Sequence, residues 1–223
     1  MQSKLRTTFS VVYFIVVIDA IVCNSIESLS PFYFYLKPAI LTLLIVYFWL
    51  RSTHLNKKTK SLTLLALTFS LIGDILLMFV YKSPNFFIGG LVSFLFAHLM
   101  YILVFLKSRN KTASLLPIIV LLLIYASGIF YFLKEGLKDM LIPVIAYMLV
   151  ILFMLASAFL RKRSKATNSY NLVFAGAVFF IISDSLLALN KFYQPIPFSN
   201  ISIMLTYALA QYLIVLGVLK QND

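Results

Sequence analysis

The sequence lacks most of the side chains that form disulfides and metal sites. It contains one cysteine, Cys23, and two histidines, His54 and His98. A single cysteine excludes an intramolecular disulfide, and no cluster of cysteine or histidine residues has metal-ligand spacing. The chain also has no serine nucleophile elbow, no phosphate-binding loop and no dinucleotide fingerprint. We therefore expect neither a metal ion nor another cofactor.

Charged residues are scarce as well, and acidic ones most of all. Asp, Glu, Lys and Arg make up 12% of the 223 residues, and only 7 residues are acidic. A soluble domain carries about 25% charged residues, so this chain cannot cover itself with a polar surface. Hydrophobic residues make up 62%, and the mean hydropathy is +0.99. These values predict a multi-pass integral membrane protein, in the cytoplasmic membrane if it is bacterial, with the lipid bilayer as its surroundings.

Eight apolar runs are long enough to cross a bilayer as helices. They lie at about 9–29, 32–50, 61–80, 86–106, 113–133, 140–160, 170–190 and 198–219. Backbone groups in lipid must be satisfied within the segment, which favours helices at this length and spacing. We predict an all-α bundle of about eight transmembrane helices, forming one domain over residues 1–223.

The basic residues gather in short clusters between the apolar runs, so the net charge of +12 does not indicate nucleic-acid binding. Cytoplasmic loops of membrane proteins carry an excess of Lys and Arg. One predicted side carries Lys4, Arg6, Arg51, Lys57, Lys58, Lys60, Lys107, Arg109, Lys111, Arg161, Lys162, Arg163, Lys165 and Lys220. The other side carries Lys82, Lys134, Lys138 and Lys191. With an even number of helices, this asymmetry predicts that both termini are cytoplasmic, and we expect no nucleic-acid partner.

The chain contains a weak internal repeat. Superposing Asp74 on Asp184, an offset of 110 residues, aligns FSLIGDILLMF with FFIISDSLLAL. After one inserted residue, FAHLMYILVF (96–105) aligns with YALAQYLIVL (207–216). The repeat predicts two parallel four-helix halves, at about 1–108 and 109–223, related by an axis along the membrane normal.

The two aligned aspartates lie inside apolar runs, where a carboxylate is unfavourable. Asp74 follows Gly73 in LTFSLIGDILLMF, and Asp184 follows Ser183 in GAVFFIISDSLLAL. Each costs roughly 2.5–3.5 kcal/mol on membrane-insertion scales, and such residues usually mark a functional site. Two carboxylates in a low-dielectric site tend to share one proton, so that one serves as acid and the other as base. We therefore take Asp74 and Asp184 as candidate catalytic residues; a packing role for both is the alternative.

Three more polar residues are candidates for positioning a substrate. His98 and Tyr101 lie one turn apart on the same helix face. Ser70 lies one turn before Asp74, where it can bond that carboxylate. The alternative for His98 is a satisfied core histidine.

Other candidates come from the ends of the predicted helices. Lys37-Pro38 opens the second helix, where the lysine either pairs with a carboxylate or phosphate or extends to the membrane surface. Asn190 ends the seventh helix, and Tyr207 and Gln211 share a face of the eighth. We expect these residues, with Ser183, to line a polar cavity. Asp19 has no repeat partner, and both a structural and a functional role stay open for it.

The residues described above resemble those of the YhhN family of integral membrane proteins, whose characterised members are lysoplasmalogenases. The resemblance rests on an ordered set of segments rather than on any single one. They are Lys37-Pro38, FSLIGDILLM (69–78), FxxGGLxxFLFAHLMY (86–101), FIISDSLLALNKF (180–192) and the segment from Tyr207 to Tyr212.

The resemblance implies an eight-helix enzyme that cleaves the vinyl ether bond of a lysophospholipid substrate. The products would be a fatty aldehyde and glycerophosphoethanolamine or glycerophosphocholine. The family's two acidic positions correspond to Asp74 and Asp184 of this chain. An acid–base pair suits this chemistry, because protonation of the vinyl carbon gives an oxocarbenium ion that water attacks.

Three other classes of protein also place carboxylates in membrane helices. A proton-coupled transporter would use them as proton or cation sites, and a lipid-binding or structural protein would use them to hold helices together. An intramembrane aspartyl protease is disfavoured, because Leu71 stands where that family needs the first glycine of its motif. Substitution of each aspartate by asparagine separates catalysis from a structural role.

Overall fold

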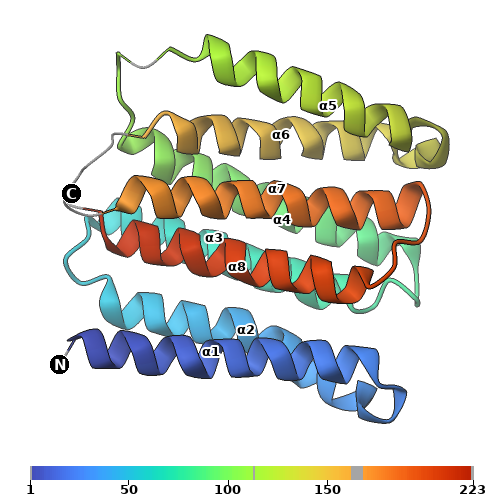
Figure 1. Ribbon diagram of the computed structural model, residues 1–223, viewed down its shortest axis with the longest axis horizontal. Helices are drawn as coiled ribbons and strands as arrows, with labels where there is room; N and C mark the ends of the chain where they lie inside the picture. Colours follow the sequence, from blue (N-terminus) through green and yellow to red (C-terminus); the bar gives the residue numbers. More distant parts are fainter. Residues whose placement is uncertain (1, 113, 162–167, 222–223) are drawn as a thin grey trace.

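The computed structural model describes residues 2–112, 114–161 and 168–221 (Figure 1). These residues form an all-α bundle of eight helices. They are α1 (Gln2–Ser25), α2 (Ser30–Arg51), α3 (Lys57–Leu77), α4 (Pro84–Lys107), α5 (Leu116–Leu137), α6 (Leu141–Phe159), α7 (Ser169–Phe192) and α8 (Ser199–Leu219). Two short 3₁₀ turns, Glu27–Leu29 and Lys138–Met140, join α1 to α2 and α5 to α6.

Seven helical stretches of the described residues are long and apolar enough to cross a membrane. One of them, Leu116–Phe159, has 44 residues and contains both α5 and α6. A straight helix of that length would extend about 66 Å at 1.5 Å per residue, twice the hydrocarbon thickness. The chain instead reverses at Lys138, whose φ is 41°, so that α5 and α6 lie side by side (Figure 1). The protein is therefore a multi-pass membrane protein, as its composition predicts.

The first helix begins earlier than its apolar run predicts. Helix α1 begins at Gln2 rather than near residue 9, and the hydroxyls of Thr8 and Ser10 bond the carbonyl oxygens of Lys4 and Arg6 at 3.0 and 2.8 Å. These bonds give the two hydroxyl groups partners within the helix. The helix can therefore begin before the apolar run.

The apolar run at 32–50 predicts the start of the second helix to within two residues, but Lys37-Pro38 does not open this helix as expected. Helix α2 begins at Ser30, with Pro31 in its first turn, and Pro38 lies inside it. Proline in the first turn of a helix loses no backbone hydrogen bond, because the N–H groups of that turn have no partner within the helix. The early start places Lys37 two turns inside the helix, where it can reach the interior of the bundle.

The chain forms antiparallel hairpins, of which α3–α4 and α7–α8 are in close contact. A Cβ atom on Gly176 of α7 would lie 2.8 Å from the carbonyl oxygen of Ala210 and 2.9 Å from the amide nitrogen of Ile214, both in α8. Only glycine permits this approach of two helix backbones. The relation between the two halves of the chain remains a prediction.

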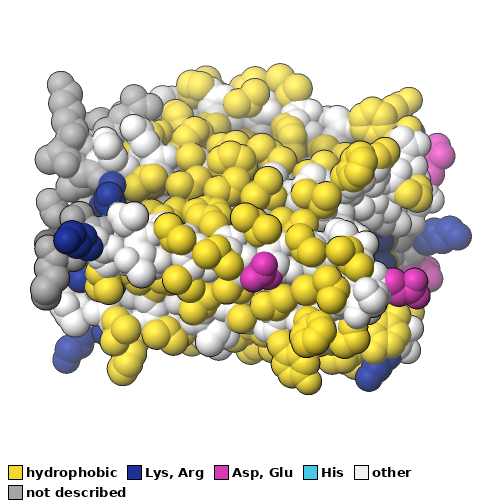
Figure 2. Space-filling view, turned by 60° about the horizontal axis from the view of Figure 1, so that its bottom comes forward, with side chains coloured by type: hydrophobic (Ala, Val, Ile, Leu, Met, Phe, Trp, Pro, Cys, Tyr) yellow, Lys and Arg dark blue, Asp and Glu magenta, His cyan; other side chains and the backbone are white. Residues whose placement is uncertain are grey.

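The start of α1 and the end of α8 lie at the same end of the bundle (Figure 1). We call this the terminal end and the opposite one the distal end. On the face seen in Figure 2, hydrophobic side chains cover the surface between the two ends. Most of the Lys and Arg side chains on this face lie at the ends. Lys162, Arg163 and Lys165 lie outside the described residues. That the terminal end faces the cytoplasm remains a prediction from the distribution of basic residues.

Candidate active site

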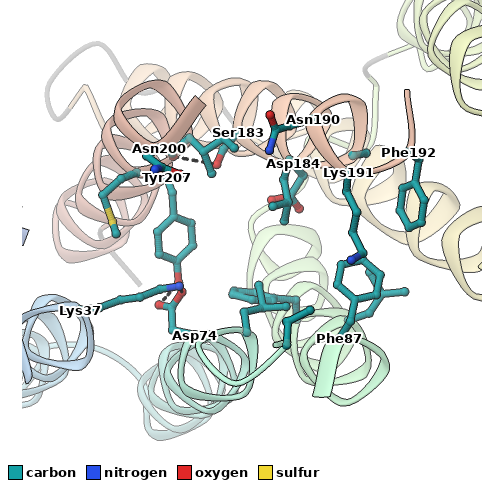
Figure 3. A pocket seen from close by; sticks show the side chains of 18 of the residues that line it. Lys37, Asp74, Phe87, Ser183, Asp184, Asn190, Lys191, Phe192, Asn200 and Tyr207 are labelled. Carbon is teal, nitrogen blue, oxygen red and sulfur yellow. Dashed lines mark hydrogen bonds and ion pairs between the residues drawn. The ribbon is translucent and has the colours of Figure 1, made fainter. Parts of the chain in front are cut away.

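A cavity of about 380 Å³ lies in the distal half of the bundle. Every α-helix except α5 contributes to its wall, and the two predicted aspartates lie on different sides of it (Figure 3). Asp74 comes from α3 and Asp184 from α7, and no hydrogen bond of the described residues joins them directly. Helices α3 and α7 both run from the terminal end to the distal end, and each carries its aspartate near its distal end. Packing of these helices then places both carboxylates at one cavity.

Asp74 is held by one cation and one phenol. The Nζ atom of Lys37 lies 3.9 Å from its Oδ1 atom, and the hydroxyl of Tyr207 donates a 2.8 Å hydrogen bond to Oδ2. The Asp74 side chain is 5% exposed and that of Lys37 is 14% exposed. A buried carboxylate needs such partners, because an uncompensated charge is unfavourable away from water. The ammonium group of Lys37 compensates a negative charge on Asp74.

Behind Tyr207, a buried polar network extends away from the cavity. Gln211 Nε2 donates to the Tyr207 hydroxyl at 3.4 Å and to Ser70 Oγ at 3.0 Å, and Tyr101 donates to Gln211 Oε1 at 2.6 Å. The predicted bond from Ser70 to Asp74 is absent from the described residues. The Ser70 oxygen instead accepts a hydrogen bond from Gln211. Each of these groups has a partner, so the network fixes the orientation of the tyrosine.

Asp184 has a different set of neighbours. The hydroxyl of Tyr147, on α6, donates a hydrogen bond to its Oδ2 atom. His98 Nε2 lies 2.9 Å from that hydroxyl and 3.6 Å from the same carboxylate oxygen. The Asp184 side chain is 17% exposed, and its Oδ1 atom accepts no hydrogen bond from the described residues. Asp184 is therefore more open to the cavity than Asp74, and neither of its two neighbours is a lysine or arginine.

The partners of the two aspartates follow a common pattern. Each aspartate is contacted from the helix that precedes its own, by Lys37 of α2 or Tyr147 of α6. These two residues are 110 apart, as are Asp74 and Asp184. A residue from the other half completes each set, Tyr207 of α8 or His98 of α4. The internal repeat remains a prediction, which this pattern supports.

Most of the predicted site residues line the cavity, and the others lie behind its wall. The lining set is Lys37, Asp74, Ser183, Asp184, Asn190 and Tyr207. Ser70, His98 and Tyr101 are fully buried outside the lining. Two of the lining residues serve local structure: the Ser183 hydroxyl donates to the Ile203 carbonyl at 3.1 Å, and Asn190 Oδ1 accepts from the Ile196 amide at 2.9 Å. Asn190 thereby shapes the connection between α7 and α8.

Sequence reasoning missed Tyr147, Lys191 and two asparagines, Asn24 and Asn200, all of which line the cavity. Tyr147 is the one tyrosine in LIPVIAYMLVILFMLASAF, but nothing in the sequence predicts that it lies beside Asp184. Lys191 Nζ lies 4.4 Å from the centre of the Phe87 ring, and both residues line the cavity (Figure 3). Such a contact between distant segments has no pattern in the sequence.

Asp19 lies apart from this site. It is exposed on α1 and does not line the cavity. Its neighbours on the outer surface of that helix, Ile15 and Ile18, are also exposed. Asp19 therefore provides an intramembrane aspartate against which the two cavity aspartates can be compared.

The fold and the cavity define a multi-pass membrane protein with carboxylates on two walls of an interior site. The chain belongs to the YhhN family, which it matches over residues 32–218. It is 35% identical to the human lysoplasmalogenase TMEM86B over 157 residues, which is 70% of this chain and 62% of that protein. It is 34% identical to the human lysoplasmalogenase TMEM86A over 164 residues, 70% of this chain and 65% of that protein. The chain thus covers less than two thirds of the length of either relative, and no solved structure matches it.

Proposed function

We propose that this protein hydrolyses the vinyl ether bond of a lysoplasmalogen by acid–base catalysis with Asp74 and Asp184. One observation carries the proposal: both carboxylates line the same cavity, and each accepts a hydrogen bond from its own tyrosine. Two relatives named lysoplasmalogenases supply the reaction class. The products would be a fatty aldehyde and glycerophosphoethanolamine or glycerophosphocholine.

The cavity suits a lipid with one chain and a polar headgroup. Its volume of about 380 Å³ lies within the usual range of small-molecule sites. Apolar side chains such as Leu91 and Met204 provide a surface for the alkenyl chain. Lys191, with Asn24 and Asn200, provides polar groups at helix ends for the phosphate and glycerol. A lysolipid already resides in the bilayer, so that it can enter between helices.

The different neighbours of the aspartates suggest their roles. Asp184, which is the more exposed of the two and whose Oδ1 atom accepts no hydrogen bond from the described residues, would carry the proton and deliver it to the vinyl carbon that is not bonded to oxygen. The resulting oxocarbenium ion carries its positive charge at the carbon bonded to oxygen. Asp74, whose negative charge Lys37 compensates, would accept a proton from the water that attacks this carbon.

The remaining steps balance the reaction. Water addition gives a hemiacetal, whose hydroxyl proton moves to the glycerol oxygen as the carbon–oxygen bond breaks. The net change is consumption of one water and formation of one aldehyde and one alcohol. The proton held by Asp74 returns to Asp184 through water in the cavity before the next turnover.

A proton-coupled carrier is the rival that uses the same carboxylates. A carrier needs access to its site from both sides of the membrane. The cavity of the aspartates lies in the distal half, and the second cavity of the described residues, at the terminal end, shares no lining residue with it. A site confined to one half of the bundle fits an enzyme better than a carrier.

The direct test measures aldehyde release by the purified protein in detergent. Lysoplasmalogen and the matching saturated alkyl-ether lysolipid are compared, because only the vinyl ether can form the oxocarbenium ion by protonation at carbon. We expect aldehyde from the vinyl ether alone. Asp74→Asn and Asp184→Asn should each decrease the rate by about 100-fold or more, the range in which general acid–base groups act.

The matched control is Asp19→Asn, which changes an intramembrane aspartate outside the cavity. It should retain wild-type activity. Full activity of both cavity variants would exclude the acid–base pair. No aldehyde from a folded wild-type protein, combined with proton-dependent flux in liposomes, would favour the carrier.

A further inference from the structure

A second cavity, of about 630 Å³, lies at the terminal end of the bundle. Its wall is formed by α1, α2, α8 and the segment that connects α2 to α3. The cavity is separate from the candidate active site and contains neither aspartate. The proposed hydrolase activity gives it no role.

The cavity is strongly basic. Arg6, Arg51 and Lys220 line it, and none of them pairs with a carboxylate of the described residues. No described acidic residue lies at the terminal end. The described acidic residues are farther along the helices, and they are Asp19, Glu27, Asp74, Glu135, Asp139 and Asp184. Three cations around one space, with no anion among the described neighbours, repel one another unless a ligand compensates them.

The cavity also has a defined wall. Tyr47 is buried in it, and its ring stacks on that of Phe9 with 3.8 Å between the ring centres. His54 Nε2 lies 3.0 Å from the carbonyl oxygen of Leu219, which joins the loop after α2 to the end of α8. These contacts hold the three helices that carry the cations in a fixed relation.

We propose that this cavity binds the phosphate headgroup of an anionic phospholipid. Guanidinium groups bind phosphate oxygens through two parallel hydrogen bonds, and lysine adds a point charge. The position at the ends of three transmembrane helices is where lipid headgroups lie, and basic pockets between such helices recognise anionic lipids. Leu50 lines the cavity and is 61% exposed. It adjoins the apolar outer surface of α2, on which Val46 and Trp49 are also exposed. That surface provides a place for the acyl chains, which a free phosphate ion would not use.

A purely topological role for these cations makes a different prediction. Orientation by the positive-inside rule depends on the number of Lys and Arg residues on one side of the membrane, not on where they converge. Lys57 and Lys58 lie at the same end of the bundle, are exposed and do not line the cavity. The pair Lys57→Gln/Lys58→Gln therefore removes the same charge as Arg51→Gln/Lys220→Gln without touching the site.

The experiment measures lipid binding to the full chain in a neutral detergent, by native mass spectrometry and by the shift in Tm. The probes are phosphatidylglycerol, phosphatidylcholine with the same acyl chains, and inorganic phosphate. We expect phosphatidylglycerol to bind and to raise the Tm, and the other two to do neither. Each cation near an anionic lipid contributes a factor of about 5 in affinity, so Arg51→Gln/Lys220→Gln should weaken binding about 25-fold. The Lys57→Gln/Lys58→Gln control should retain wild-type affinity.

Three results would overturn the proposal. Equal weakening in the two double variants would show a diffuse charge effect. Equal binding of phosphatidylcholine would show that the anionic headgroup is not recognised, and equal binding of inorganic phosphate would identify a site for free anions. Because the readout is binding rather than turnover, the result is independent of the hydrolase proposal.

Discussion

At the scale of single residues, the two tyrosine hydroxyls are the groups that distinguish the carboxylates from simple buried charges. Tyr207 bonds Asp74 and Tyr147 bonds Asp184, so each carboxylate is oriented by a neutral donor. A hydrogen bond to a charged group contributes about 1.5–3 kcal/mol. We expect Tyr147→Phe and Tyr207→Phe each to lower kcat for aldehyde release roughly 10- to 100-fold while the protein remains folded.

The control for these variants is Tyr212→Phe. The Tyr212 hydroxyl bonds Ser10 and does not line the cavity. Loss of the hydroxyl there should leave kcat unchanged. Equal kcat in all three phenylalanine variants and the wild type would contradict a role for hydroxyl donors in catalysis.

The pairing of Lys37 with Asp74 predicts a second residue-scale result, on stability. Removing one partner of a mostly buried ion pair leaves the other charge uncompensated, at a cost of about 3–5 kcal/mol for fully buried pairs. Lys37→Met should therefore lower the Tm, and Asp74→Asn in the same chain should recover part of the loss. Thermal unfolding of the two single variants and the double variant measures this coupling. Additive losses would show that the 3.9 Å approach contributes no coupling energy.

At the scale of helices, the close approach of α7 and α8 is what holds Asp184 and Tyr207 in one site. Gly176→Leu would push a side chain against the backbone atoms of Ala210 and Ile214, which cannot move away singly. Overpacking costs about 1–3 kcal/mol and sometimes more. We expect a lower Tm and loss of activity, since separation of α7 and α8 moves Asp184 away from Tyr207 and the Asp74 that it bonds.

Gly128→Leu on α5 is the matched control. A Cβ atom there has no neighbour within 4 Å, and α5 does not line the cavity. Its Tm should stay near that of the wild type. A drop as large as that of Gly176→Leu would show that the contact between α7 and α8 is not the cause.

The sequence predicts the elements of this site better than their contacts. Apolar runs predict every helix, because a bilayer requires about 20 apolar residues for each crossing. The cost of a carboxylate in lipid draws attention to Asp19, Asp74 and Asp184 alike, and the repeat offset of 110 residues distinguishes the last two. Tyr147 escapes this reasoning, since its place beside Asp184 depends on how α6 packs against α7. The prediction for Ser70 is wrong for the same reason. Its spacing of one turn favours a bond to Asp74, but the packing of α8 places Gln211 beside its hydroxyl.

At the scale of the whole molecule, the predicted orientation is directly testable. In a Cys23→Ser chain, Lys58→Cys places a thiol at the terminal end and Lys82→Cys places one at the distal end. An impermeant maleimide added to intact cells should label residue 82, and residue 58 only after the membrane is opened. The basic residues of the terminal end set this expectation. The reverse labelling pattern would contradict cytoplasmic termini.

If the protein hydrolyses lysoplasmalogen as proposed, the position of the aspartate cavity at one end of the bundle determines where the two products go. An aldehyde with a long alkyl tail partitions into the surrounding lipid, whereas the glycerophosphodiester is too polar to follow it. The diester would leave toward the water at the distal end, which is the nearer membrane surface for a cavity in the distal half. If the termini are cytoplasmic, each turnover delivers a water-soluble phosphodiester outside the cytoplasm and a reactive carbonyl to the membrane. Cleavage would then be vectorial, sorting one lipid into two compartments without a transport step.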